Sequence, residues 1–205
     1  MENYITVRHS AEFEYEDRKS RFIAECIPVE CEADALAFIE RMRKSYPDAN
    51  HHVYAYVIKE NSIARFTDDR EPSGTAGMPV LDIIRKNGCT NVAIVVVRYF
   101  GGTLLGTGGL VRAYSGAALG ALKAAEIITY DIYSGYEIEC SYSDYQKIGT
   151  LLSSSGFRTE NTEYSDVITV TGSIRHDLGG DFEKKLVEIT SGRIIIKKTG
   201  EKFDF

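Results

Sequence analysis

The sequence predicts an α+β protein built from two domains, and three observations support this prediction. Segments with helical spacing alternate with strand-like segments along the chain. The composition changes after about Glu126, which divides the chain into a first domain, 1–126, and a second domain, 127–205. The second domain has the order βαββαβ over about 75 residues, which is the ferredoxin-like pattern. We therefore expect a mixed first domain and a ferredoxin-like second domain.

The elements of the first domain follow from periodicity and from turn residues. Strands are predicted where apolar residues alternate or run continuously, and helices where they recur every three or four residues. Proline and glycine mark the boundaries, with Pro47 after the first helix, Pro79 in the first turn of the second and Gly88 after it. The predicted strands are 21–29, 51–58, 63–67 and 92–97, with a turn at 59–61, and the predicted helices are 33–44, 78–86 and 110–125.

The second domain follows by the same rules. The last helix of the first domain carries a face of glycine and alanine, so we expect it to lie close to a sheet. After it, the predicted strands are 132–141, 158–164, 167–174 and 193–198, and the predicted helices are 144–154 and 178–189. The sequence contains neither an internal repeat nor a long linker.

Composition narrows the functional classes. The chain of 205 residues has 43% apolar and 26% charged residues, as in ordinary globular proteins. It lacks the long apolar stretch of a membrane helix and the pattern of a signal peptide, and its four cysteines are dispersed. We therefore expect a cytoplasmic protein with reduced thiols, without a membrane partner, a bound metal or a cofactor. Its net charge of −6 argues against wholesale binding of nucleic acid.

The charge is unevenly distributed, however. Between Asp82 and Glu126 there is no carboxylate, and all the cations of this segment, Arg85, Lys86, Arg98, Arg112 and Lys123, lie in an otherwise acidic chain. Such a segment is compatible with a partner that carries phosphates, and equally with solvated cations paired to carboxylates elsewhere in the fold.

A glycine-rich loop, which we call the glycine loop, lies at the centre of this basic segment and carries Gly101, Gly102, Gly106, Gly108 and Gly109. It matches neither a P-loop nor a dinucleotide-binding fingerprint. Its backbone amides can nevertheless hold a phosphate at the start of the next helix, although glycines also serve tight turns and close packing. The candidate binding residues are the glycines, two hydroxyls, flanking cations and a stacking tyrosine: Arg98, Tyr99, Gly101, Gly102, Thr103, Gly106, Thr107, Gly108, Gly109, Arg112 and Lys123.

A second constellation is the acidic, turn-rich segment 68–77. Its carboxylates and hydroxyls can orient water or bind a hard cation, but acidic turn residues also bond local amides, so a structural or interaction loop is the alternative. The secondary candidates are Asp68, Asp69, Glu71 and Ser73, together with His52. His51 and His52 begin a strand, so we expect their side chains to face opposite sides. We assign no catalytic residue from this pattern.

Four long motifs in the first domain resemble the IMPACT/YigZ family in its two-domain bacterial form. They are KSRFIA (19–24), NHHVYAY (50–56), DDREPSGTAGMPVL (68–81) and VRYFGGTLLGTGGLVRAY (97–114). The second domain matches by pattern and position. The resemblance implies a first domain like the second domain of a small-subunit ribosomal protein, with a βαβ unit. It also implies a ferredoxin-like second domain similar to the last domain of elongation factor G.

The resemblance implies no catalytic activity for the bacterial form. Eukaryotic relatives act in translational control, by competing for the activator of an initiation-factor kinase. We do not expect this role to transfer, because it depends on an additional amino-terminal domain that is absent here.

Three functions remain as hypotheses. The first is a binding protein that engages RNA, the ribosome or a translation factor through the basic glycine-loop face, without evident DNA specificity. The second is an enzyme that acts on a small phosphorylated or peptide substrate where 68–77 meets the glycine loop. The third, a protein–protein regulator, requires an exposed apolar patch above a few hundred Å². The sequence leaves the oligomeric state open.

Overall fold

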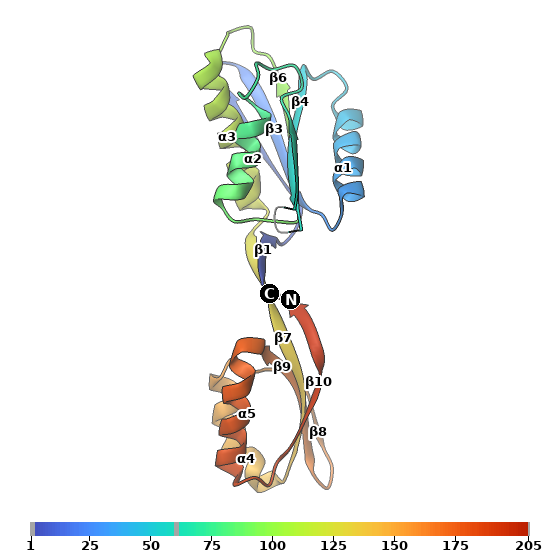
Figure 1. Ribbon diagram of the computed structural model, residues 1–205, viewed down its shortest axis with the longest axis vertical. Coiled ribbons are helices and arrows are strands. Elements are labelled where there is room, and N and C mark those ends of the chain that lie inside the picture. Colours follow the sequence, from blue (N-terminus) through green and yellow to red (C-terminus); the bar gives the residue numbers. More distant parts are fainter. Residues whose placement is uncertain (1–2, 60–61, 205) are drawn as a thin grey trace. The chain divides into compact units, whose positions relative to one another are not determined.

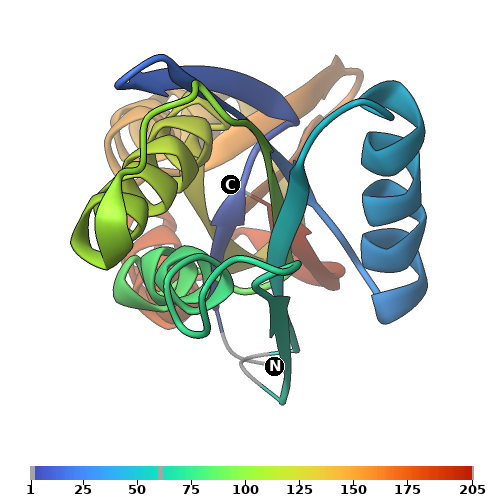
Figure 2. The same ribbon diagram turned by 90° about the horizontal axis from the view of Figure 1, so that it is seen from above.

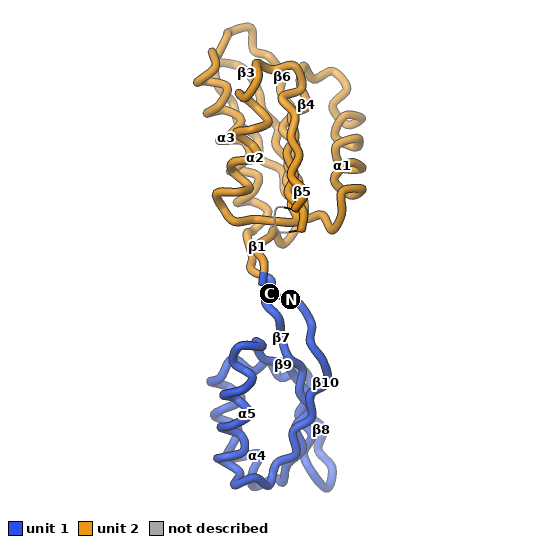
Figure 3. The backbone as a smooth tube through the Cα atoms, viewed as in Figure 1, with its two compact units in different colours: residues 1–3, 130–205 blue, residues 4–129 orange. Residues whose placement is uncertain are grey.

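A computed structural model describes residues 3–59 and 62–204. The chain divides into two compact units, residues 4–129 (unit 2) and residues 1–3 with 130–205 (unit 1), which Figure 3 colours separately. Each unit has its own sheet and its own buried apolar residues. The predicted α+β class is confirmed, with helices packed on a separate sheet in each unit.

Unit 2 is built on a five-stranded antiparallel sheet in the order β2-β3-β6-β4-β5. Its strands are β2 (Ala11–Asp17), β3 (Ser20–Pro28), β4 (His51–Ile58), β5 (Ile63–Thr67) and β6 (Val92–Tyr99), and β1 (Tyr4–Val7) pairs with β7. Because β3 and β4 both run antiparallel to the central β6, they are parallel to each other. The connection between them is therefore the βαβ crossover that the family resemblance implies.

Helices cover both faces of this sheet, as Figures 1 and 2 show. One face packs on α1 (Glu32–Ser45), and the other packs on α2 (Gly77–Lys86) and α3 (Gly106–Ala124). All the residues of β6 from Val92 to Arg98 are buried, because this strand is central and covered on both faces.

The small-residue face of α3 lies against β2, as expected from its glycines. A Cβ at Gly120 would lie 2.2 Å from the ring of Phe13, and one at Gly116 would lie 3.6 Å from the ring of Tyr15. The predicted strands do not include β2, because most of its residues are charged. Its signal is a strict alternation, in which Phe13 and Tyr15 occupy every second position between Glu12, Glu14 and Glu16.

Unit 1 has the ferredoxin-like order predicted from its pattern. Its elements are β7 (Ile127–Cys140), α4 (Tyr142–Ser154), β8 (Arg158–Tyr164), β9 (Ile168–Arg175), α5 (His176–Thr190) and β10 (Ile195–Asp204). The strands lie in the order β10-β7-β9-β8, all antiparallel, and residues of both helices pack on the core of the sheet. Strand β10 extends beyond the predicted end at 198 because it pairs with β7 as far as Asp204.

Two further boundaries differ clearly from the predicted ones: β7 begins at Ile127 and not at residue 132, and the start of α3 differs in a way that matters for the site. Helix α3 begins at Gly106 and not at residue 110, so Thr107, Gly108 and Gly109 lie in its first turn. The turn predicted at 59–61 includes residues 60 and 61, which lie outside the described residues.

Candidate functional site

The candidate site lies at one end of the unit 2 sheet, which we call the loop end. Here β6 leaves the sheet next to the starts of β3 and β4, since Tyr99 pairs with Arg21 and Arg98 pairs with His51. The loop after β5 reaches the same end, because Thr67 pairs with Tyr54. Thus two segments that are far apart in sequence, 68–77 and the glycine loop, come together at this end.

The glycine loop owes much of its composition to backbone geometry. A Cβ at Gly101 would lie 2.1 Å from the carbonyl carbon of Lys19, so only glycine allows this close approach to the turn between β2 and β3. Gly102 and Gly106 have φ values of +80° and +72°, where other residues are strained. Gly108 lies in a helical turn, where a Cβ would make only an ordinary contact with the Arg112 guanidinium at 3.6 Å. These glycines therefore shape the loop, whatever it binds.

A cavity of about 470 Å³ opens beside this loop. Its volume is in the range of small-molecule sites. One part of the lining is apolar and comes from Pro72, Phe100, Leu104, Leu105 and Leu110, while Asn50, His51, Glu71, Arg98 and Thr107 add polar groups and Gly106 adds backbone.

A buried ion pair forms the polar side of the cavity. Nη1 of Arg98 donates to Oε1 of Glu71 over 2.5 Å, and both side chains are almost inaccessible, at 6% and 4% exposure. The hydroxyl of Tyr114 donates to the same oxygen over 2.7 Å. Burial, with the Glu71 carboxylate beside it, raises the pKa of Tyr114, so its hydroxyl remains a donor. This cluster joins β6, the 68–77 loop and α3.

Arg98 lies between two aromatic rings, and one of its hydrogen-bond donors has no partner among the described residues. Its guanidinium carbon lies 5.5 Å from the ring centre of Phe22 and 5.7 Å from that of Phe100. Its Nη2 lies 3.5 Å from Oγ of Ser20. Among the described residues, its buried Nε has no hydrogen-bond partner. Since buried polar atoms are nearly always paired, this deficit distinguishes the cavity from an ordinary core.

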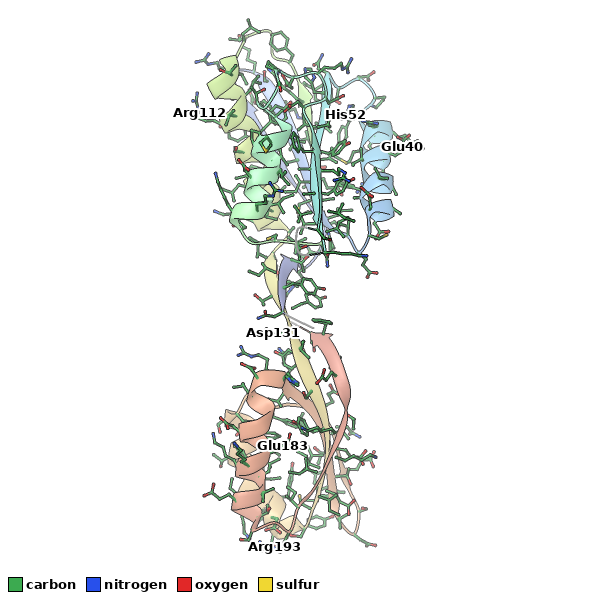
Figure 4. All side chains as sticks on the ribbon, in the orientation of Figure 1. Glu40, His52, Arg112, Asp131, Glu183 and Arg193 are labelled. Carbon is green, nitrogen blue, oxygen red and sulfur yellow. The ribbon has the colours of Figure 1, made fainter. Side chains whose placement is uncertain are left out.

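His51 also belongs to this cavity, although the sequence pointed to His52. Nδ1 of His51 lies 2.8 Å from the carbonyl oxygen of Asp69. A carbonyl oxygen can only accept, so Nδ1 carries the proton and Nε2 of the neutral ring is an acceptor. Nε2 lies 3.7 Å from Oε1 of Glu71. His52 points to the opposite face, where its Nε2 lies 2.9 Å from the carbonyl oxygen of Tyr46, on the α1 side (Figure 4).

The other carboxylates of the 68–77 loop accept hydrogen bonds from backbone amides. Asp68 accepts hydrogen bonds from the amides of Gly74, Ala76 and Gly77, at 2.8–3.0 Å, and so holds the start of α2. Asp69 accepts from the amide of His52 over 2.6 Å. Of the predicted acidic candidates, only Glu71 faces the cavity, and Ser73 is exposed elsewhere in the loop.

The structure also separates the cations of the basic segment. Arg98 was expected to be an exposed charge that meets a phosphate, but its side chain is buried against Glu71. Lys123 lies in the last turn of α3, roughly 25 Å along the helix from the glycine loop at 1.5 Å per residue. Arg85 and Lys86 lie in the last turn of α2, away from its Asp68-bonded start. Only Arg112, on the outer side of α3, stays near the loop (Figure 4).

Other cations, which are not among the residues predicted from the sequence, also lie at the loop end. Arg18 and Lys19 are exposed at the turn between β2 and β3, and Nη1 of Arg18 lies 3.4 Å from the carbonyl oxygen of Leu104. Arg70 is 78% exposed, with a loose 4.0 Å contact to Asp69, and its Nη2 donates to the carbonyl of Asn50. These cations lie close together because of the register in which the strands pair. The distribution of charge along the sequence does not reveal that register.

The aromatic residue at the cavity is Phe100 and not Tyr99, the stacking residue expected from the sequence. Tyr99 is half-buried and packs in the core on the α1 side, whereas the neighbouring Phe100 is 45% exposed and lines the cavity. Adjacent residues leaving a strand point to opposite faces, so only one of the two can reach the site. Thr103 and Thr107 are exposed in the loop and in the first turn of α3.

The start of α3 favours an anion. No side chain caps it, and its first turn contains no carboxylate. Its free amides and helix dipole therefore present partial positive charge beside the cavity. A Cβ on Gly108 would lie 3.6 Å from Nη1 of Arg112, so this guanidinium lies beside the first turn.

Among the described residues, no group of three or more His, Cys, Asp or Glu side chains is placed to hold a metal ion. Within the same residues, no helix combines the length and apolar character needed to cross a bilayer.

Comparison with known proteins identifies the family. The model of the Impact N-terminal domain matches residues 18–122, and that of a domain of unknown function (DUF1949) matches residues 138–193. A solved structure described as "Crystal structure of an hypothetical protein" has a TM-score of 0.61 and 33% identity. The match covers 96% of this chain and 97% of that one.

Relatives agree with these matches. IMPACT family member YvyE of Bacillus subtilis is 34% identical over 199 residues, covering 97% of this chain and 92% of the relative. IMPACT family member YigZ of Escherichia coli is 32% identical over 197 residues, covering 95% and 97%. Human Protein IMPACT is 34% identical over 94 residues, covering 44% of this chain and 29% of the relative. The chain therefore belongs to the IMPACT family.

Proposed function

We propose that this protein is a cytoplasmic, non-enzymatic binding protein that engages single-stranded RNA, including exposed RNA of the ribosome, through the loop end of unit 2. One observation carries the proposal: exposed cations lie next to a partly apolar cavity that the uncapped start of α3 borders. Arg18 and Arg70 contact the carbonyls of two of its lining residues, and Arg112 lies beside the first turn of α3. Phosphates supply the charge that such cations attract, and unpaired bases supply flat apolar faces that fit the cavity.

The surrounding charges support phosphate contact at this end rather than along the whole basic segment. Arg18, Arg70 and Arg112 are exposed, whereas Arg98 is neutralised by Glu71. A protein with a net charge of −6 needs such local concentration of cations to attract a polyanion.

The test is the salt dependence of binding to a short single-stranded oligoribonucleotide. Arg112→Ala should weaken binding and reduce the slope of log affinity against log salt by about one. Lys123→Ala is the matched control, because it removes a cation from the other end of the same helix. Absence of binding at low salt would reject the proposal, as would equal losses for the two variants. Binding of a protein factor instead of RNA would also reject it.

The enzyme hypothesis has one observation in its favour, the approach of His51 Nε2 to Glu71 within the cavity. An oriented imidazole beside a carboxylate is suited to proton transfer. If this pair is catalytic, hydrolysis of a phosphomonoester or dipeptide should be lost in His51→Ala and retained in His52→Ala, since His52 faces α1. If the native protein hydrolyses neither class of substrate, the enzyme hypothesis is rejected and only the binding function remains.

A further inference from the structure

We propose that the loop-end cavity holds one guanine nucleotide unit, with its base inside the cavity and its phosphate at the start of α3. This inference rests on the proposed function and deepens it, because it names the chemical group that is recognised. The same unit occurs as an unpaired residue of an RNA chain and as a free mononucleotide.

Size and shape support a base within the cavity. Its volume of about 470 Å³ exceeds that of a single nucleobase and leaves room for part of a ribose. Phe100, at 45% exposure, and Leu104, at 81% exposure, supply apolar surface at its lining. The Arg98 guanidinium, 5.7 Å from the centre of the Phe100 ring, helps to hold that ring in place. Aromatic rings in such positions stack on the faces of unpaired bases.

The polar groups favour guanine over the other bases. Oε1 of Glu71 already accepts from Arg98 and Tyr114, whereas its Oε2 has no hydrogen-bond partner among the described residues. In the neutral form of its ring, His51 offers Nε2 as a second acceptor nearby. Two neighbouring acceptors require two neighbouring donors. Guanine offers the N1–H and the 2-amino group side by side, whereas adenine, cytosine and uracil each place an acceptor beside their donor.

The first turn of α3 supplies the phosphate position. Gly106 and Thr107 line the cavity, so the free amides of this turn border the space in which the base would lie. The Thr107 hydroxyl is exposed, and the Arg112 guanidinium lies beside Gly108. An anion here would meet backbone donors and a full positive charge together, and its base would be directed toward Glu71 and His51.

The first experiment measures binding of free GMP, IMP and AMP to the full chain by calorimetry. IMP differs from GMP only by the missing 2-amino group, so GMP should bind about tenfold more tightly than IMP or AMP. Phe100→Ala should weaken GMP binding by a similar factor. Phe66→Ala is the control, because Phe66 has comparable exposure, 40%, and is not among the lining residues. Equal binding of the three nucleotides, or of the two variants, overturns the inference.

The second experiment distinguishes the source of the nucleotide and separates this inference from the proposed function. Oligoribonucleotides carrying one guanosine, one inosine or one abasic residue are compared. A loss of about tenfold for the last two, abolished in Phe100→Ala, supports a residue of an RNA chain. GMP binding without RNA binding supports a free mononucleotide and rejects the proposed function. Salt-dependent RNA binding that ignores the base and Phe100 rejects this inference and retains the proposed function.

Discussion

At the scale of single residues, the Arg98–Glu71 pair is the most consequential feature of the site. It is buried, it orders the groups that line the cavity, and it joins three segments of unit 2. A buried ion pair adds little net stability when compared with apolar residues of similar size, but removal of one partner leaves an uncompensated charge. The pair is therefore better understood as a device that orients polar groups than as a source of stability.

Glu71→Gln should therefore destabilise unit 2 by about 3–5 kcal/mol, because the Arg98 charge stays buried without its counter-charge. Urea unfolding followed by circular dichroism measures the change. The double variant Glu71→Leu with Arg98→Met should recover much of the loss, since neither charge then remains. Glu40→Gln is the exposed control, at 57% exposure with Lys44 as its partner, and should cost less than about 1 kcal/mol. Equal costs for Glu71 and Glu40 would contradict this account of the pair.

The glycines of the loop differ in what they tolerate. Gly101→Ala places a methyl group 2.1 Å from the backbone of Lys19 and must displace the loop, so we expect destabilisation and loss of ligand binding. Gly108→Ala has space and helical geometry, and should stabilise α3 by about 0.5–1 kcal/mol. Thermal unfolding of the two variants tests this contrast. A Gly101→Ala variant as stable as the native protein would show that the close approach is unnecessary.

At the scale of elements, unit 1 contains a second charged cluster that ties α4 to the segment before β10. Asp144 in the first turn of α4 accepts hydrogen bonds from Arg193, Lys147 and the Ser141 hydroxyl. The Arg193 hydrogen bonds hold the pKa of Asp144 well below its ordinary value of 3.8. The carboxylate is thus stabilised in the folded state relative to the unfolded chain.

This cluster predicts a pH dependence of stability. A carboxyl group with a lowered folded pKa contributes stability above its unfolded pKa and loses it as the pH falls toward the folded value. Asp144→Asn should therefore destabilise unit 1 at neutral pH, and the deficit should shrink as the pH falls below about 4. Urea unfolding of both proteins between neutral and acid pH provides the measurement. A deficit that is constant with pH would exclude an ionic contribution from Asp144.

The elements themselves were largely predictable, and the exceptions have physical causes. Periodicity located β4 and β5 at their observed bounds because alternating faces are a local property. It placed the start of α3 four residues late, because glycines disfavour helix on their own and form the first turn here through tertiary packing. The same local patterns predicted that His51 and His52 face opposite sides, but not which of them reaches the cavity.

At the scale of the molecule, residues that are neighbours in sequence separate in space. The basic segment suggested one face, yet α3 alone is about 28 Å long and carries Arg112 and Lys123 to different ends. Conversely, Arg18, Arg70 and the glycine loop meet through strand register. A single sequence does not show which strands pair over long range. The family motifs therefore marked the loop end more accurately than the charged residues did.

Each unit has its own core, which predicts that core damage stays within one unit. Leu186 is fully buried on α5 in unit 1, and Leu122 is fully buried on α3 in unit 2. Leu186→Ala should cost about 2–5 kcal/mol and raise hydrogen exchange in 130–204, with little change in unit 2. Leu122→Ala should show the reverse pattern. Loss of protection throughout the chain in either variant would mean that the units unfold together.

The most direct test of the central claim is an NMR titration of the native protein with a short guanosine-containing single-stranded RNA. The account predicts shifts of the Gly106, Thr107 and Gly108 amides and of the Phe100 ring, which weaken as salt is raised. Arg112→Ala should reduce the affinity and, in the free protein, leave the Phe100 ring resonances in place, since its guanidinium lies beside Gly108 and not beside that ring. RNA binding that shifts only unit 1, or that leaves the α3 amides unchanged, would contradict the account.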